Sequence, residues 1–349
     1  MKDTVMYRQI LNNIHKRQFN SDFALAGGRY KNTSRTEEQK AFDSLAKILA
    51  VYNKKVCVAI AVAGTFFDKR YYVTYNANTG SESECDKFLL NTKKIITSCI
   101  NNQEDSLSDE LVKSVLNDNK LKNKLVNSVF KLNTGYIGQS KQLIFGIMRN
   151  VETHYKQAKL ATTTVDDRHE HYNFLCEAYS QIKDFLNSNE VLGKNYRLIN
   201  QVKSSLSEFY KINLNIKRVC SYFKDNGDFI KNLIIIQNHS TPNNQIHAEM
   251  ILLEHIHSDY HESYNSEAYI GISKLSCMPC SKVIKLYNES ANNLDVQYHG
   301  THGKVYENWN YPNKICSIVS EENFVSELEN CESLFLPLGR DDATTSDSN

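Results

Sequence analysis

The sequence is poor in proline and glycine, with 4 and 13 of them among 349 residues. This scarcity of chain breakers argues against flexible linkers, collagen-like repeats and barrels rich in tight turns, and it predicts long helices. The sequence also lacks a charge excess, since 41 basic and 40 acidic side chains give a net charge of +1 at pH 7. A protein that depends on non-specific phosphate contacts is usually more basic, so this balance weakens the case for a nucleic-acid substrate without excluding it.

Long hydrophobic runs are absent too. The longest, residues 56–67, is too short to span a membrane and contains a glycine. Residues 1–20 are mixed polar and charged, unlike a signal peptide or an arginine-rich transit peptide. We therefore expect a cytoplasmic protein without a membrane partner, and we leave open its export into another cell as an effector without a classical signal peptide.

Cysteine is present in an odd number, nine residues, and most of them are widely separated. Only Cys277 and Cys280 have a spacing with chemical meaning. A chain of this length can bury a full core without disulfide bonds. The pattern therefore predicts reduced thiols and one metal site.

Apolar spacing divides the chain into four parts. Residues 1–80 combine N-terminal helices with the first helix and the β-hairpin of a core. Residues 81–229 show helical spacing almost throughout and predict an inserted helical subdomain. Residues 230–335 alternate short strands and helices, which is typical of a layered α/β core. Residues 336–349 are polar and predict a disordered tail.

Two local patterns shape the first of these parts. Ser34 followed by Glu37 fits a capping box, which predicts the start of a helix. Residues 55–63 and 70–75 are strand-like runs separated by a short turn, which predicts a hairpin.

Residues suited to binding a metal ion occur in two short segments of the 230–335 part. His247 and Glu249 stand at a predicted helix start, and Cys277 and Cys280 open a helix that follows a strand. A catalytic zinc ion takes three protein ligands and keeps one open position. The two cysteines share one helix face, and a helix N-terminus favours their thiolate forms. We therefore expect His247, Cys277 and Cys280 to bind Zn²⁺.

Glu249 has a different expected role. It lies two residues beyond His247, so its carboxylate points in another direction on the helix and can reach a water molecule in the open position. There it would act as the general acid and base. The alternative is a structural zinc site, but no fourth protein ligand presents itself beside the three.

The H-x-E and C-x-x-C segments, 277 − 247 = 30 positions apart, resemble the cytidine-deaminase-like superfamily. The chain more narrowly resembles the predicted nucleic-acid and nucleotide deaminases of intracellular bacteria and fungi. Three segments carry that resemblance: HAEMILLEHI at 247–256, YIGISKLSCMPC at 269–280 and THGKVYENWNYP at 301–312. One departure is that Ser276 replaces the usual proline before the first cysteine, while Pro279 lies between the cysteines.

The resemblance implies a three-layer α/β core, a mixed sheet flanked by helices, into which a large all-helical insertion is placed. It implies a zinc-dependent hydrolase that deaminates cytosine or adenine in a nucleotide or a single-stranded nucleic acid. One alternative is a deaminase of free nucleosides or other small amino-heterocycles. Another is a non-catalytic interaction module that binds a partner protein through the helical insertion, but such a module has no need of Glu249.

Members of the wider superfamily often hold the substrate with an asparagine near the end of the second strand. Asn76 fits this place if the hairpin is correct, and Asn238 fits if residues 232–237 are the second strand; we expect Asn76. The further expected substrate contacts are Ala248, Ser276, His302 and Trp309. Trp309 is the only tryptophan; bases stack well on such rings, although a ring of this kind is also a common core residue.

Overall fold

The protein is described here from a computed structural model. The described residues are 3–20, 30–31, 34–54, 57–64, 69–76, 81–101, 104–117, 123, 142–160, 164–187, 194–238, 246–260, 266–290, 294–306 and 308–333. The predicted tail at 336–349 and the turn of the predicted hairpin therefore lie outside the described residues. Contacts divide the chain into two compact units, a first unit of residues 1–46, 55–87 and 231–349 and a second unit of residues 47–54 and 88–230.

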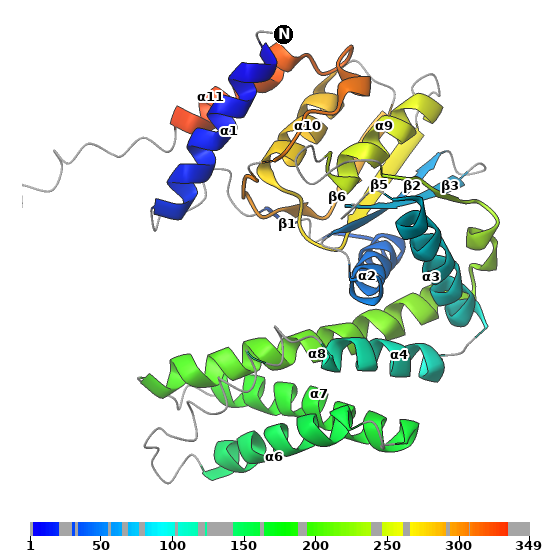
Figure 1. Ribbon diagram of the computed structural model, residues 1–349, viewed down its shortest axis with the longest axis vertical. Helices are drawn as coiled ribbons and strands as arrows, with labels where there is room; N and C mark the ends of the chain where they lie inside the picture. The colour runs from blue at the N-terminus through cyan, green and yellow to red at the C-terminus, as the bar shows by residue number, and fades with distance from the viewer. Residues whose placement is uncertain are drawn as a thin grey trace, which may run out of the picture. The chain divides into compact units, whose positions relative to one another are not determined.

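A five-stranded mixed sheet forms the centre of the first unit (Figure 1). Its strands, in spatial order, are β4 (Leu233–Ile235), β3 (Lys69–Tyr75), β2 (Val58–Gly64), β5 (Ser266–Ile272) and β6 (Leu294–Tyr298). Strand β2 pairs antiparallel with β3 and β5, while β3 with β4 and β5 with β6 are parallel pairs. This arrangement confirms the mixed sheet predicted from the sequence, including the pairing of β2 with β3.

Helices cover both faces of this sheet. The helices of this unit include α1 (Asp3–Asn20), α2 (Glu37–Tyr52), α9 (Ala248–Tyr260), α10 (Met278–Glu289) and α11 (Glu321–Ser333), of which α2, α9 and α10 lie against the sheet. Helices α9 and α10 lie on one face, where their apolar side chains share a buried cluster with alternate residues of β2 and β5 (Figure 1). Helix α2 packs against the other face. The three-layer core predicted from the sequence is therefore confirmed.

The contact between α2 and β5 is unusually close, and it depends on Gly271. A Cβ atom at this position would lie 2.9 Å from the backbone atoms Asp43 N and Phe42 C. The next residue, Ile272, donates its N–H to Asp43 Oδ1 at 3.3 Å, and Tyr269 donates its hydroxyl to Asp43 Oδ2 at 2.9 Å. The lack of a side chain at Gly271 thus lets the helix backbone rest directly on the strand.

The start of α2 differs from the prediction. Thr36 and Gln39 form the reciprocal capping box: Gln39 N donates to Thr36 Oγ1 at 3.2 Å and Thr36 N donates to Gln39 Oε1 at 3.1 Å. The predicted box from Ser34 to Glu37 is wrong by two residues. Both pairs fit the pattern S/T-x-x-E/Q, but the helix begins at Glu37, directly after Thr36.

Helices α1 and α11 pack against each other and against the same cluster as α9 and α10 (Figure 1). Arg8 Nη2 donates to Asn310 Oδ1 at 2.6 Å, and the His15 ring donates from Nδ1 to the Val305 carbonyl at 3.0 Å. A short pair of strands, β1 (Tyr30–Lys31) and β7 (Gly300–Thr301), was not predicted from the sequence. Helix α1 thus holds the segment that follows β7.

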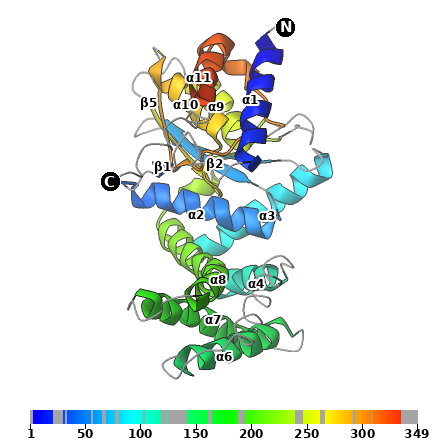
Figure 2. The same ribbon diagram turned by 90° about the vertical axis from the view of Figure 1, so that its left-hand side faces the viewer.

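The second unit is helical in its described part. Its elements include α4 (Glu104–Leu116), α6 (Gln142–Lys159), α7 (Val165–Asn187), α8 (Lys194–Lys224) and the 3-10 turn η2 (Gly227–Ile230), while α3 (Glu82–Ile100) enters it at Phe88. Helices α6, α7 and α8 lie alongside one another (Figure 2) and enclose a core of their own. This helical block is the insertion that the sequence predicted.

Two expectations from the sequence concern disulfide bonds and membrane-spanning helices. No disulfide joins the eight cysteines whose side chains are described. None of the described helices is both long enough and apolar enough to cross a membrane.

Candidate active site

A pocket of about 200 Å³ opens in the first unit. Its wall is formed by Cys57, Asn76, His247, Glu249, Lys274, Leu275, Cys277, His302, Tyr306 and Asn308. These residues come from the beginning of β2, the end of β3, the starts of α9 and α10 and the segment after β7. The sheet topology therefore brings five distant parts of the sequence to one place.

The predicted metal ligands converge at this pocket. Nδ1 of His247 lies 3.4 Å from Cys277 Sγ and 3.5 Å from Cys280 Sγ. With a Glu249 oxygen, the four possible ligand atoms all lie within 4.8 Å of one another, and all four residues are buried. Among the described residues, this is the group of His, Cys, Asp and Glu side chains that could hold a metal ion.

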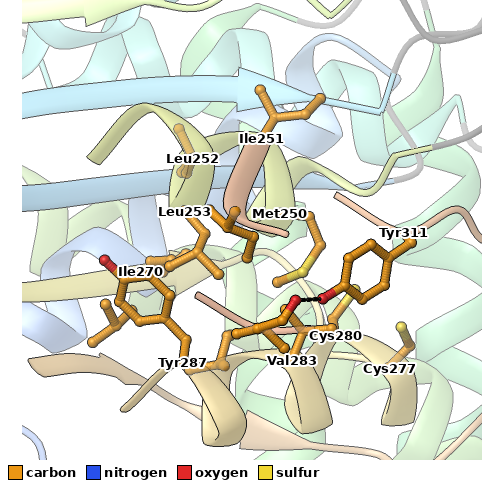
Figure 3. Packing of buried hydrophobic residues seen from close by; sticks show 14 of the residues in the cluster. Met250, Ile251, Leu252, Leu253, Ile270, Cys277, Cys280, Val283, Tyr287 and Tyr311 are labelled. Atoms are coloured by element: carbon orange, nitrogen blue, oxygen red, sulfur yellow. Dashed lines mark hydrogen bonds between the residues drawn. The ribbon is translucent and has the colours of Figure 1, made fainter. Parts of the chain in front are cut away.

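The start of α10 sets the two cysteines side by side (Figure 3). Cys277 is the N-cap residue, in extended conformation, and Cys280 follows in the first turn. Pro279 is tolerated there because the first N–H groups of a helix have no partner within the helix. The spacing of three residues thus places both sulfur atoms toward one point.

The loop before α10 is held by hydrogen bonds from the segment around β7. Ser276 N donates to the Gly300 carbonyl at 2.9 Å, and the Ser276 carbonyl accepts from Thr301 Oγ1 at 2.9 Å and from His302 N at 3.0 Å. Met278 N donates to the Lys304 carbonyl at 2.9 Å. These bonds fix the loop at Ser276, directly before Cys277.

Glu249 lies in the first turn of α9 and forms part of the pocket wall. The Ser276 hydroxyl donates to Glu249 Oε1 at 3.0 Å, and both side chains are buried. This bond leaves the other carboxylate oxygen available to the pocket and fixes the side chain beside the ligand cluster.

Within the cluster, the side chains of His247, Cys277 and Cys280 change one another's pKa values. Burial opposes the charged form of Cys277, but hydrogen bonding with Cys280 and the positive field of His247 outweigh it and lower the pKa of Cys277 to about 6. Burial likewise opposes protonation of His247, yet the Cys277 thiolate raises the pKa of His247 to about 9. Burial and the neighbouring Cys277 raise the pKa of Cys280 well above its ordinary value. The metal-free cluster therefore holds protons that a metal ion would displace.

Asn76 lies where the sequence placed it, at the end of β3 in the pocket wall. Its Oδ1 accepts a hydrogen bond from Ala248 N at 2.8 Å. Ala248 is fully buried, and its backbone N–H group is the part that contacts Asn76. The other candidate, Asn238, is buried away from the lining and donates from Nδ2 to the Tyr75 carbonyl at 2.7 Å.

His302 and Trp309 have different surroundings. His302 lines the pocket, accepts from Lys304 N at 3.0 Å through Nδ1, and has its pKa lowered by burial and by Lys304. Trp309 is only 1% exposed and does not line the pocket. Its ring therefore has no open face on which a base could stack in this conformation, and its Nε1–H donates to Cys280 Sγ at 3.1 Å.

Several lining residues were not among those predicted from the sequence: Cys57, Lys274, Leu275, Tyr306 and Asn308. Tyr306 is 43% exposed, and its ring meets the His247 ring edge-on with 5.7 Å between centroids. Burial and the charge of Glu249 raise the pKa of the Cys57 thiol to about 12, so this thiol is uncharged at neutral pH. Sequence signals existed for some of them: Lys274 and Leu275 stand just before Cys277, and Tyr306 and Asn308 belong to the 301–312 segment that carries the family resemblance.

Comparison with known proteins gives a match for the part of the chain that contains the ligand cluster. Residues 246–313 match the family described as OTT_1508_deam-like deaminase. No curated protein and no solved structure matches the chain. The match covers a minor part of the chain, but that part contains His247, Glu249, Cys277 and Cys280. The resemblance to a deaminase family that the sequence motifs predicted is confirmed for residues 246–313.

Proposed function

We propose that this chain is a zinc-dependent deaminase that uses water to replace the amino group of a nucleobase with a carbonyl oxygen, releasing ammonia. The observation that carries the proposal is the convergence of His247, Cys277, Cys280 and Glu249 at one pocket. The deaminase match over residues 246–313 supports the reaction type.

The donor set fits zinc. A tetrahedral zinc ion, with a Zn–S distance of about 2.3 Å and a Zn–N distance of about 2.0–2.1 Å, requires sulfur and nitrogen ligands about 3.5–3.6 Å apart. The distances from His247 Nδ1 to the two sulfur atoms are 3.4 and 3.5 Å. One imidazole and two thiolates would thus hold the ion, and a fourth position remains toward the pocket.

Zinc, when bound, lowers the pKa of a coordinated water molecule toward neutrality and so provides a nucleophile. Glu249 would accept the proton of the attacking water and transfer it to the ring nitrogen. It would then take the remaining proton of the added hydroxyl group, as the carbonyl forms, and pass it to the departing amine. Ser276 supports this role because its hydroxyl bonds one oxygen of Glu249 and leaves the other for proton transfer.

The pocket favours a small planar group. Its volume of about 200 Å³ is below the roughly 300–1,000 Å³ of sites for drug-sized ligands. A single base would be enclosed, while the sugar and phosphates remain outside. Asn76 offers an amide at one side, and Tyr306 offers a half-exposed ring on which the base would stack. A nucleotide or a single-stranded nucleic acid meets these conditions.

The test is an ammonia-release screen of the full chain over cytidine, adenosine, their phosphates, and single-stranded DNA and RNA. Glu249→Gln should abolish release from the active substrate and should retain stoichiometric zinc. The matched control is Glu254→Gln, which changes another buried carboxyl of α9 that instead accepts from Lys314 N at 2.9 Å. Unchanged turnover in Glu249→Gln would reject the proton-transfer role.

Metal analysis provides the second arm of this test. Cys277→Ser and Cys280→Ser should each purify without stoichiometric zinc, because a serine hydroxyl is a poor replacement for a thiolate ligand. Cys316→Ser, at an exposed cysteine outside the cluster, should retain the metal of the unmodified chain. Full zinc occupancy in both ligand variants would contradict the assignment.

A further inference from the structure

Trp309 is held in one orientation by a buried group of aromatic rings. Its ring meets Tyr7 of α1 nearly perpendicularly, with 6.1 Å between centroids and an interplanar angle of 85°. Tyr311 lies at 6.2 Å and 81°, and Phe324 of α11 at 5.2 Å and 34°. Rings from α1 and α11, together with Tyr311 two residues further along the chain, therefore fix the direction of the indole N–H bond.

The indole N–H bond of Trp309 points to Cys280, one of the predicted metal ligands. Trp309 Nε1 lies 3.1 Å from Cys280 Sγ, and the exposed fractions of the two residues are 1% and 0%. An indole N–H can only donate, so the sulfur must be the acceptor. A hydrogen bond to a charged acceptor is stronger than one to a neutral acceptor, so the contact favours the thiolate form of Cys280.

The two cysteines differ in this respect. Cys277 is part of the pocket wall, whereas Cys280 lies behind it and is covered by the Trp309 ring system. A thiolate that shares its charge with an N–H group donates less of it to a metal ion. Trp309 therefore contacts the ligand cluster through the Cys280 sulfur atom and does not line the pocket.

We propose that Trp309 is a positioning residue for the metal ion: its N–H hydrogen bond orients Cys280 and withdraws negative charge from the Cys280 sulfur. This inference rests on the proposed function, because it requires Cys280 to be a metal ligand. Partners of this kind fix the direction and basicity of a ligand, and their loss typically lowers metal affinity by about 10- to 100-fold.

The test is Trp309→Phe in the full chain, which removes the N–H group and keeps an aromatic ring in the cluster. Zinc affinity, measured against a competing chelator, should fall roughly 10- to 100-fold, because the loss of a fixed orientation for Cys280 outweighs the gain in charge on its sulfur. In the Co²⁺-substituted protein, the sulfur-to-metal charge-transfer band should move to longer wavelength, because the sulfur lone pairs rise in energy without the hydrogen bond. Unchanged affinity together with an unchanged band would overturn the proposal.

The matched control is Tyr311→Phe. Tyr311 belongs to the same aromatic group, but its hydroxyl donates to the Val319 carbonyl instead of to a ligand. This variant should leave both the affinity and the band of the unmodified chain in place. If it changes them as much as Trp309→Phe does, packing of the rings is responsible and the hydrogen bond is not.

A measurement on the unmodified chain covers the case in which Trp309→Phe does not fold. The emission of the only tryptophan should be strongly quenched when one equivalent of Co²⁺ is added to the metal-free protein. Binding of Co²⁺ without a change in emission would overturn the proposal alone. Failure of the unmodified chain to bind any metal would overturn the proposed function as well, so the two failures are distinguishable.

Discussion

Tyr306 and Trp309 lie three residues apart in one segment, yet their rings meet opposite surroundings. Tyr306 is 43% exposed at the pocket, and Trp309 is 1% exposed in the core. From the sequence, Trp309 is a candidate stacking residue, because it is the only tryptophan, with a position in the core as the alternative. Its partner Tyr7 is 302 positions away and Phe324 lies in another element, so no local pattern could show that the ring is enclosed.

At the residue scale, we predict that Tyr306→Ala raises KM for the active base-containing substrate by about tenfold or more, because stacking of a base on an aromatic ring contributes about 1–3 kcal/mol. Tyr306→Phe should keep KM within a few-fold, since the ring remains. Steady-state ammonia release measures both. An equal rise in the two variants would show that the hydroxyl, near His302 Nε2 at 3.4 Å, is the important group instead.

The ligand set could be predicted because it is local. His247 with Glu249, and Cys277 with Cys280, are close pairs in the sequence, and each pair lies at the start of one helix. Cys57 could not be predicted in the same way. It reaches the pocket only because β2 pairs with β5, a contact between residues more than 200 positions apart.

At the scale of elements, the close contact between α2 and β5 depends on one missing side chain. We predict that Gly271→Ala destabilises the protein by about 1–3 kcal/mol, the usual cost of overpacking, since the new Cβ would meet helix backbone at 2.9 Å. Neither backbone can rotate away as a side chain would. Chemical denaturation of the purified variant measures the change.

Gly146→Ala is the matched control. Gly146 lies in α6, and an added Cβ would have nothing within 4 Å. Alanine is favoured over glycine inside a helix by about 0.5–1 kcal/mol, so this variant should be as stable as the unmodified chain or more so. A gain in stability from Gly271→Ala would show that α2 does not press on β5 as described.

A second contact between elements joins α4 to α7. Arg168 Nε donates to Asp109 Oδ1 at 2.7 Å, both side chains being 9% exposed, and Lys113 bonds the other oxygen at 2.6 Å. Burial would raise the pKa of Asp109, but the hydrogen bonds from Lys113 and Arg168 outweigh it and lower the pKa. The lowered pKa means that ionised Asp109 stabilises the folded state.

We predict that Asp109→Asn costs about 3 kcal/mol at pH 7, because it removes the carboxylate charge that pairs with the buried Arg168. The stabilisation is complete above the ordinary aspartate pKa of 3.8 and is lost as the pH falls through the lowered folded-state value. The difference between variant and unmodified chain should therefore shrink below pH 4. Thermal unfolding across this range measures it.

The control for this charge removal is Glu152→Gln. Glu152 pairs with Lys156 one turn along α6, with side chains 35% and 69% exposed, and such pairs contribute about 0.3–0.5 kcal/mol. A loss at pH 7 as large as that of Asp109→Asn would indicate a general charge effect. The contact between α4 and α7 would then not be specific.

At the scale of the whole molecule, each unit has a core of its own. The predicted ligands belong to the cluster around α9, α10 and the sheet, whereas α6, α7 and α8 enclose the other cluster. In the sequence, helical spacing without proline changes near residue 230 to short alternating segments, and the boundary predicted there rests on that change. The sequence could not show that residues 47–54 belong with the second unit, since they continue the helical pattern of α2.

We predict that removal of the metal by a chelator accelerates amide hydrogen exchange in α9 and α10 and leaves exchange in α7 and α8 unchanged. A ligand at about 100 times its Kd stabilises the state that binds it by about 2.7 kcal/mol, which corresponds to about 100-fold slower exchange. Exchange followed by mass spectrometry gives both regions at once. Equal acceleration in both would show that metal binding stabilises the chain as one unit.

The joining of α1 to the segment after β7 has a consequence for the synthesis of this protein. Arg8 and Asn310 are 302 positions apart, and α1 also packs against α11. A ribosome that has released α1 must therefore add about 300 residues before this helix meets its partners, and contacts of such long range form slowly. During that interval Tyr7 lacks its neighbours Trp309, Tyr311 and Phe324, so the apolar face of α1 stays exposed until the segment that carries them has left the ribosome.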